Sequence, residues 1–178
     1  EHVAAPADMI GLIEQYEDGL KSRIYEIVNN VVGNNLLEAN YVHSVEDVDI
    51  LPPIMYPSKN MNAAVNFYTH ACEGCTEEQL AERTRQRQEN RGVPYLFLKP
   101  TRGAIIGSGD DIVMPYGRDR IEWEVEMAIV IGRAGKYVSA PRAYDHVFGY
   151  MVGMDVSDRG GRPPGGYGSG SDWFVGKG

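Results

Sequence analysis

The chain has little cysteine, few basic residues and no long apolar run. Its 178 residues include 17 Lys and Arg against 25 Asp and Glu, which gives a formal net charge of -8. This charge argues against a nucleic-acid partner, because phosphate binding requires basic patches. No apolar stretch approaches the roughly 20 residues that span a bilayer, and the first residues carry no signal-peptide pattern. We therefore expect a cytoplasmic protein that binds neither nucleic acid nor a membrane.

Only two cysteines are present, Cys72 and Cys75, and they have the spacing C-x-x-C. This spacing occurs in redox pairs and in half of a zinc site. No second C-x-x-C exists, and no strand pattern precedes the pair as in a thioredoxin-like unit. We therefore expect two reduced cysteines, with a C-x-x-C zinc module as a remote alternative.

The composition and the residue patterns favour a single globular domain that contains both helices and strands. Apolar residues make up 43% of the chain and charged residues 24%, which is ordinary for a globular protein. Apolar periodicity and capping patterns predict helical structure over residues 8–29, 58–73, 76–91 and 139–147. Short apolar runs predict strands over residues 95–98, 111–114, 122–131 and 148–156.

The predicted strand over residues 122–131 carries glutamates on one face. Side chains alternate along a strand, so Glu122, Glu124 and Glu126 share one face while the other face is apolar. Carboxylates two residues apart lie roughly 6–7 Å from each other at the backbone. If they are partly buried, either one is protonated or a cation lies between them. A solvated acidic strand end is the alternative.

A third carboxylate is available from the next predicted strand. Asp155 ends an apolar run, and an ionised Asp in such a place requires a partner. Hard divalent ions such as Mg²⁺ prefer oxygen ligands. The two strands together therefore suggest a divalent-cation site.

Four segments resemble, in the same order, motifs of the fumarylacetoacetate hydrolase family. They are F-x-K-P at residues 97–100, E-x-E-[LM]-A-x-x-x-G at 124–132, F-G-Y…N-D-x-[ST]-x-R at 148–159 and a stretch ending in G-K at 173–177. The resemblance runs from about residue 55 to residue 178. Met154 replaces the usual Asn before the Asp, and Asp158-Arg159-Gly160 replaces Ala-Arg-Asp, so the substrate region departs most from the family pattern.

The resemblance implies an α+β fold, with a mixed, mostly β roll or barrel core of the fumarylacetoacetase type and peripheral helices. We expect an N-terminal helical segment over residues 1–50 and the catalytic domain over residues 51–178. By resemblance the domain lacks roughly its final third, which would leave strand edges unpaired. Family members are commonly homodimers, so we also expect self-association.

The resemblance also implies roles for particular residues. Glu124, Glu126 and Asp155 would hold Mg²⁺, Mn²⁺ or Ca²⁺, the same three carboxylates that the strand argument reaches. Residues 66–73 fit the family frame N-Y-x-x-H-x-x-E, in which His70 would be the general base and Glu73 its partner.

Arg159 and Lys177 match family positions that reach the substrate. Lys99 is expected either to reach it as well or to lie on the surface. The implied function is hydrolysis of a C–C bond in a short acylpyruvate or other 1,3-dicarbonyl oxo acid through a metal-bound enolate. One alternative is isomerisation or decarboxylation of 2-hydroxyhepta-2,4-diene-1,7-dioate-type diacids or of oxaloacetate. Another is a non-catalytic binding or scaffold fragment.

Overall fold

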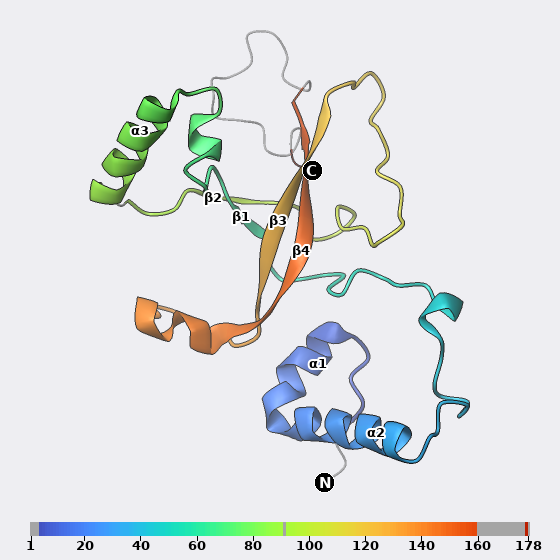
Figure 1. Ribbon diagram of the computed structural model, residues 1–178. Coiled ribbons are helices and arrows are strands. Elements are labelled where there is room, and N and C mark those ends of the chain that lie inside the picture. Colours follow the sequence, from blue (N-terminus) through green and yellow to red (C-terminus); the bar gives the residue numbers. More distant parts are fainter. Residues whose placement is uncertain (1–3, 91, 160–176, 178) are drawn as a thin grey trace.

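The computed structural model describes residues 4–90, 92–159 and 177 of the chain. In this part, two antiparallel strand pairs lie next to each other, with helices at the periphery (Figure 1). Most of the predicted G-K segment lies outside the described residues, although its Lys177 is described. The predicted end of a helix at residue 91 also lies outside them.

The N-terminal helical segment is broken rather than continuous. Helix α1 covers Met9–Gln15, a π-helical turn covers Tyr16–Leu20, and α2 covers Lys21–Gly33. The prediction of one helix over residues 8–29 was therefore wrong in its middle. Gly19 adopts φ +106°, which a glycine tolerates and which ends the regular helical path there. Figure 1 shows the resulting angle between α1 and α2.

The first strand pair joins two segments that are distant in sequence. Strand β1, Met61–Ala63, runs antiparallel to β2, Leu96–Leu98. Strand β2 was predicted. Residues 58–73 were expected to form a helix or a helical loop, and they contain β1 followed by a 3₁₀ turn, His70–Cys72. Hydrogen bonds between Ala64 and Tyr95 and between Lys99 and Asn60 extend the pairing. This long-range pairing overrides the local helical preference.

Helix α3, Glu77–Glu89, lies beside the first strand pair. The helix expected over residues 76–91 begins with a capping box, in which the Thr76 side chain accepts from the Gln79 backbone and the Gln79 side chain accepts from the Thr76 backbone. The helix buries none of its residues, as its nearly all-polar sequence indicates.

The second strand pair is the longest regular element. Strand β3, Ile121–Ile131, pairs antiparallel with β4, Val147–Asp158, and both strands were predicted from the sequence. Their connection contains a 3₁₀ helix, Ala140–His146, where a short helix was expected. Residues 111–114, predicted as a strand, pair with no strand among the described residues and are exposed to solvent.

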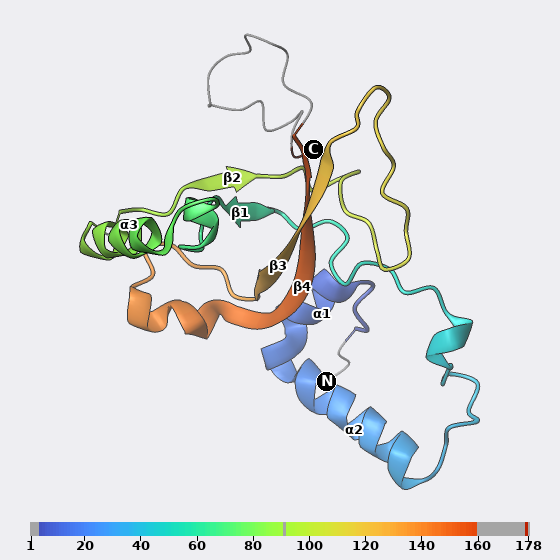
Figure 2. The ribbon, with the colours of Figure 1, turned by 45° about the horizontal axis from the view of Figure 1, so that its top comes forward.

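A close contact at the end of this ladder joins it to the N-terminal helices. A Cβ atom on Gly132 would lie 2.8 Å from Cβ of Phe148 and 3.2 Å from Cγ2 of Ile13. The Phe148 ring also meets the Tyr16 ring edge to face, with centroids 5.1 Å apart. Figure 2 shows α1 lying next to this end of β3 and β4.

Half of the buried side chains in the described part are polar or charged. The buried residues are Leu20, Cys72, Phe97, Asp155, Ser157 and Lys177. By contrast, the apolar face of β3 is open: Trp123, Val125 and Met127 are 66%, 60% and 66% exposed. No described element covers this apolar face.

The prediction of a mixed helix-and-sheet fold is confirmed. The described strands form two two-stranded sheets, and they do not close into a roll or a barrel. In the described residues, every helix is too short or too polar to cross a membrane.

Candidate active site

The carboxylates predicted as metal ligands lie together on one face of the β3–β4 ladder. Glu124 is directly opposite Asp155, and Glu126 is directly opposite Gly153. Directly opposite residues of an antiparallel pair point to the same face, so all three carboxylates project on the same side. Gly153 places no side chain opposite Glu126.

The ammonium of Lys177 lies between two of these carboxylates. Its Nζ is 2.5 Å from Oδ2 of Asp155 and 3.2 Å from Oε1 of Glu124. It also lies 5.3 Å from the centroid of the Phe97 ring. The side chain of Lys177 is only 7% exposed, so its charge is neutralised mainly by these carboxylates.

Lys99 approaches Asp155 from the other side. It follows β2, and its Nζ donates to Oδ1 of Asp155 at 2.8 Å and to the carbonyl oxygen of Val156 at 3.0 Å. The side chain is 10% exposed. The structure thus brings Lys99 to the site, with two of its donors used on the end of β4.

A residue that sequence reasoning missed also lies in this cluster. Ser157 is 1% exposed, and its hydroxyl donates to Oε1 of Glu124 at 3.0 Å and accepts from Nζ of Lys177 at 2.5 Å. Its position two residues after Asp155, on the same strand face, was the available signal. Ser157 connects the two strands at the centre of the site.

Arg159 completes the charged cluster at its outer end. Its Nε donates to Glu122 at 2.9 Å, and its Nη2 contacts Oε1 of Glu124. Burial would lower the pKa of the Arg159 guanidinium, but the Glu122 hydrogen bond and the charge of Glu124 raise it above its ordinary value. Arg159 is therefore a fixed cation at the mouth of the cluster.

The surroundings shift the pKa values of Glu126 and Asp155 in opposite directions. Burial, then the charges of Glu124 and Asp155, raise the pKa of Glu126 above its ordinary value, and Lys177 only partly opposes them. Burial would also raise the pKa of Asp155, but hydrogen bonds from Lys177 and Lys99 outweigh it and hold that pKa below its ordinary value. Glu126 is thus the carboxylate whose negative charge is least compensated.

The donor chemistry of this cluster fits a hard divalent cation, although the arrangement is not that of a formed metal site. Glu124, Glu126 and Asp155 supply only oxygen donors, which Mg²⁺ and Ca²⁺ prefer. The crowding that raises the pKa of Glu126, through burial and the neighbouring carboxylates, is the kind that a cation relieves. Within the described part, however, no three His, Cys, Asp or Glu side chains are close enough to hold a metal ion. The ammonium of Lys177 supplies positive charge there instead.

The two residues predicted as a catalytic dyad, His70 and Glu73, are in contact. Nδ1 of His70 lies 2.7 Å from Oε1 of Glu73, and the side chains are 42% and 75% exposed. His70 lies in a 3₁₀ turn, His70–Cys72, between β1 and α3. A protonated His70 would lower the pKa of Glu126, so the dyad lies within electrostatic range of the carboxylate cluster.

The expectation of two reduced cysteines was wrong. Cys72 and Cys75 form a disulfide, with their Cα atoms 5.3 Å apart, inside the range that disulfides require. The tight turn between them, rather than the C-x-x-C spacing alone, brings the two sulfurs together. Sulfurs joined in this way are not available as zinc ligands.

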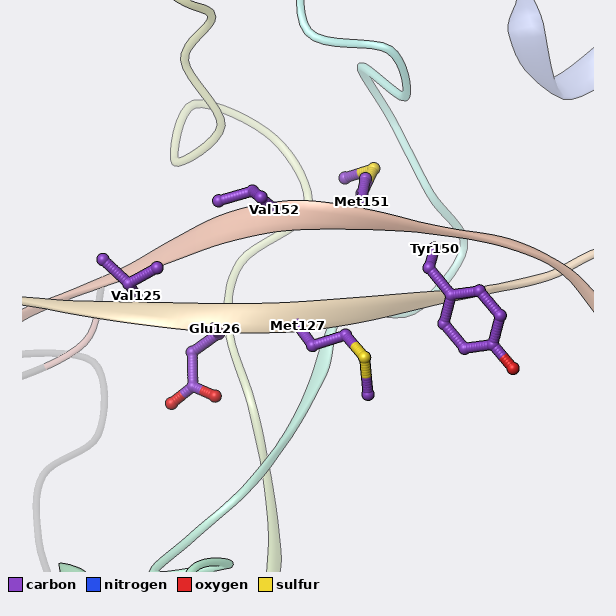
Figure 3. A pocket seen from close by; sticks show the side chains of 6 residues that line it. All are labelled: Val125, Glu126, Met127, Tyr150, Met151 and Val152. Atoms are coloured by element: carbon purple, nitrogen blue, oxygen red, sulfur yellow. The ribbon is translucent and has the colours of Figure 1, made fainter.

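A shallow hollow of about 460 Å³ lies along the middle of the ladder, next to the charged cluster. Its lining residues are Val125, Glu126, Met127, Tyr150, Met151 and Val152. Figure 3 shows the carboxylate of Glu126 pointing away from Met151 and Val152 of β4. The hollow is mostly apolar and includes neither the dyad nor the cations, so the charged cluster defines the candidate site better than the hollow does.

Comparison with known proteins identifies similar sequences. Residues 60–178 match the family model described as "Fumarylacetoacetate (FAA) hydrolase C-terminal". Mitochondrial oxaloacetate tautomerase FAHD2A of Bos taurus is 31% identical over 175 residues, which are 97% of this chain and 47% of that protein. Mitochondrial oxaloacetate tautomerase FAHD2B of Homo sapiens is 33% identical over 113 residues, which are 64% of this chain and 32% of that protein.

The chain therefore spans about half the length, or less, of these relatives. The similarity to the bovine protein extends into the first fifty residues, which the sequence motifs did not include. A solved structure from Mycobacterium smegmatis, described under the name HpcE, is 21% identical with a TM-score of 0.55. The superposed part covers 89% of this chain and 47% of the Mycobacterium smegmatis chain. This similarity concerns the fold alone.

Proposed function

This chain belongs to the fumarylacetoacetate hydrolase family, and on that premise we propose that it takes part in moving a proton at the carbon next to the carbonyl of a short 2-oxo acid. The preferred reaction is keto–enol tautomerisation of an oxaloacetate-type diacid. The observation that carries the proposal is the His70–Glu73 pair, which lies within electrostatic range of Glu126. Two relatives named oxaloacetate tautomerases support the choice of substrate class.

His70 is the proposed base. Its Nδ1 faces the carboxylate of Glu73, so the neutral ring that carries its proton on Nδ1 donates to Glu73 and keeps the lone pair of Nε2 available. Such an arrangement fixes the tautomer of the base and stabilises the imidazolium that forms when Nε2 takes a proton. His70 would then remove a proton from the substrate carbon and return it to the other site of the keto–enol pair.

The proposed metal ligands are Glu124, Glu126 and Asp155, with Mg²⁺ as the expected ion and Mn²⁺ or Ca²⁺ as alternatives. A divalent ion held by these residues would supply Lewis acidity, which would make the proton next to the substrate carbonyl easier to remove. The protein places carboxylates from two strands on one face of the ladder. The negative charge of Glu126 is only partly compensated by neighbouring positive charge.

The cations of the cluster are proposed to bind the acidic substrate. A chain of net charge -8 needs local positive charge to attract a dianion, and Lys177 and Arg159 provide it beside the carboxylates. Lys99 is proposed to act through Asp155, because its hydrogen bonds to Asp155 and to the Val156 carbonyl already hold its ammonium.

C–C bond hydrolysis is the second candidate. The same His70–Glu73 contact would let His70 deprotonate a water molecule that attacks a carbonyl of an acylpyruvate. Decarboxylation and isomerisation of related diacids also take place at the carbon next to the carbonyl. A non-catalytic scaffold has less support, because the relatives named above are enzymes.

The test is an assay of the full-length protein with the enol form of oxaloacetate, followed by the decay of its ultraviolet absorbance. We expect rapid conversion to the keto form with Mg²⁺ and slower conversion with a chelator. A panel of acylpyruvates assayed in parallel reports hydrolysis. Absence of any rate increase with the oxaloacetate enol, with hydrolysis of an acylpyruvate present, would replace the first candidate with the second.

We further propose that the full-length protein forms a homodimer. The open apolar face of β3, with Val125 and Met127 exposed, is consistent with burial in a larger assembly. Light scattering coupled to size-exclusion chromatography measures the mass directly, and the mass of one chain would contradict this proposal.

A further inference from the structure

The Cys72–Cys75 disulfide encloses one member of the proposed catalytic dyad, Glu73. Cys72 ends the 3₁₀ turn that begins with His70, and the two residues enclosed by the disulfide are Glu73 and Gly74. The bond therefore joins the residue before Glu73 to the residue that precedes Thr76, the N-cap of α3. No other described segment places a covalent cross-link beside a candidate active-site residue.

The enclosed turn has a defined backbone geometry. The N–H of Cys75 donates to the carbonyl of Cys72 at 2.9 Å. Glu73 has φ -54° and ψ 128°, and Gly74 has φ +77°. These are the angles of a type II turn, in which the third residue requires a positive φ and is therefore usually glycine. Glu73 thus occupies the second position of a turn whose ends are bonded to each other.

Few other contacts hold the dyad in place. The side chains of His70 and Glu73 are 42% and 75% exposed, so packing constrains them little. The turn is held by two backbone hydrogen bonds, from the Ala71 N–H to the Phe67 carbonyl at 3.0 Å and from the Cys72 N–H to the Thr69 carbonyl at 3.1 Å. A long bond from the Arg83 side chain to the Ala71 carbonyl, at 3.4 Å, is added to them. The covalent bond is consequently the strongest constraint on Glu73 among the described contacts.

We propose that Cys72 and Cys75 form a reversible thiol–disulfide site that controls the His70–Glu73 pair. In the disulfide form the turn holds Glu73 beside His70, and in the dithiol form the turn is released and the pair separates. The effect on activity rests on the proposed function, whereas the thiol chemistry and the change at His70 do not.

The reaction balances with a thiol reductant, such as a cellular dithiol or two molecules of a glutathione-type thiol. Cys75 is part-exposed, whereas Cys72 is buried, so the external thiolate attacks Sγ of Cys75 and Cys72 leaves as a thiolate. A second reductant thiolate then attacks the reductant sulfur of the mixed disulfide and releases Cys75. Two electrons and two protons enter the protein, and the reductant becomes a disulfide.

The experiment equilibrates the full-length protein in buffers with different ratios of reduced to oxidised dithiothreitol. Peptide mass spectrometry after alkylation measures the fraction of Cys72–Cys75 disulfide, and the tautomerase assay measures kcat on the same samples. We expect kcat to fall by about tenfold in the reduced form, at the same ratio at which the disulfide is lost, and to return on reoxidation. Measurable activity with the same kcat in the two forms would overturn the proposal.

A matched control removes both sulfurs with little change in shape. The double variant Cys72→Ser/Cys75→Ser should have the kcat of the reduced form and show no response to the dithiothreitol ratio. Circular dichroism verifies that it remains folded. If the double variant responded to the ratio as the parent does, the cysteine pair would not be the source of the effect.

A second readout is independent of activity. The ¹⁵N chemical shifts of the His70 ring, with the resonances assigned through His70→Gln, should differ between the two forms because only the disulfide form holds Glu73 in contact with Nδ1. If the protein lacks activity in both forms but these chemical shifts differ, the proposed function fails and the redox site stands. Unchanged chemical shifts of the His70 ring overturn the redox site.

Discussion

Glu124 and Asp155 lie directly opposite each other in the β3–β4 ladder, and both carboxylates contact the ammonium of Lys177. Two like charges in register would repel each other across an antiparallel pair. The pairing is tolerated because Lys177 and Lys99 bring positive charge to Asp155. This arrangement of charges underlies the predictions that follow.

Asp155→Ala should lower both stability and metal binding. The substitution leaves the buried ammonium groups of Lys99 and Lys177 without their shared partner, which typically costs about 3 kcal/mol or more. Urea unfolding of the full-length protein measures the stability, and calorimetry with Mg²⁺ measures the binding. Asp145→Ala is the control, because Asp145 makes only an exposed ion pair with Arg142, worth about 0–1 kcal/mol. Equal stability of the two variants would contradict the role given to Asp155.

Ser157→Ala should destabilise the protein by about 1–3 kcal/mol, because it removes a buried hydroxyl that bonds both Glu124 and Lys177. Ser139→Ala is a suitable control. Ser139 precedes the 3₁₀ helix and makes no side-chain capping bond, so its removal should have little effect. Chemical denaturation of both variants decides the matter, and a similar midpoint for the two would show that the Ser157 hydroxyl contributes nothing.

His70→Ala should reduce proton transfer by about 10²–10⁴-fold, the range for a general base, while leaving metal binding and folding unchanged. His70 is partly exposed and belongs to the dyad rather than to the carboxylate cluster. Enol decay gives the rate, and calorimetry gives the affinity for Mg²⁺. The matched control is His43→Ala, since His43 is exposed and outside the site. Full activity of His70→Ala would falsify the dyad assignment.

Glu126→Gln should make the protein more stable at neutral pH when no divalent ion is present. Burial and the charges of Glu124 and Asp155 raise the pKa of Glu126 above 4.5 in the folded state. The stabilising contribution of the protonated form is therefore complete below pH 4.5 and is lost as the pH rises through the folded pKa. The variant avoids this loss, and we expect a gain of about 1–2 °C in Tm at pH 7 in the presence of a chelator.

Addition of Mg²⁺ should cancel or reverse that gain, because the ion binds the parent and stabilises it. Thermal unfolding of both proteins at pH 4 and pH 7, with and without Mg²⁺, measures the effect. Glu38→Gln serves as the control for loss of one negative charge, because Glu38 is exposed. A Tm difference that is independent of pH would contradict the raised pKa of Glu126 as its cause.

Gly132→Ala should destabilise the protein by about 1–3 kcal/mol. The new Cβ atom would lie 2.8 Å from Cβ of Phe148, which cannot move away without moving the backbone. Gly33→Ala is the control, because nothing lies within 4 Å of that position and the exchange should stabilise by about 0.4–1 kcal/mol. Unfolding midpoints that shift in the same direction for both variants would argue against a steric role for Gly132.

Several features of the fold were accessible from local pattern. The alternation of Glu124, Val125 and Glu126 predicted both the strand and its acidic face, since side-chain direction has a period of two residues. The Thr76–Gln79 spacing predicted the start of α3, since a capping box depends only on residues within one turn. These interactions join residues that are close together in the sequence, so a local sequence pattern is enough to predict them.

Other features depended on partners far away in the chain. Strand β1 forms because β2 pairs with it, and the local sequence at Met61 favoured a helix. The contact of Lys177 with Asp155 spans 22 residues and that of Lys99 with Asp155 spans 56. No local pattern reports the distance between such groups, because it is set by the register of two strands and the path of the chain between them.

The sequence by itself determined which residue types could form the site: three carboxylates in two strand patterns, a His three residues before a Glu, and cations in recognisable motifs. Only the tertiary structure decided that Ser157 joins Glu124 to Lys177 and that Cys72 and Cys75 meet as a disulfide around Glu73. The physical reason is that bonding and charge compensation depend on atomic separations of a few ångströms, which arise when the strands pair and the turn closes.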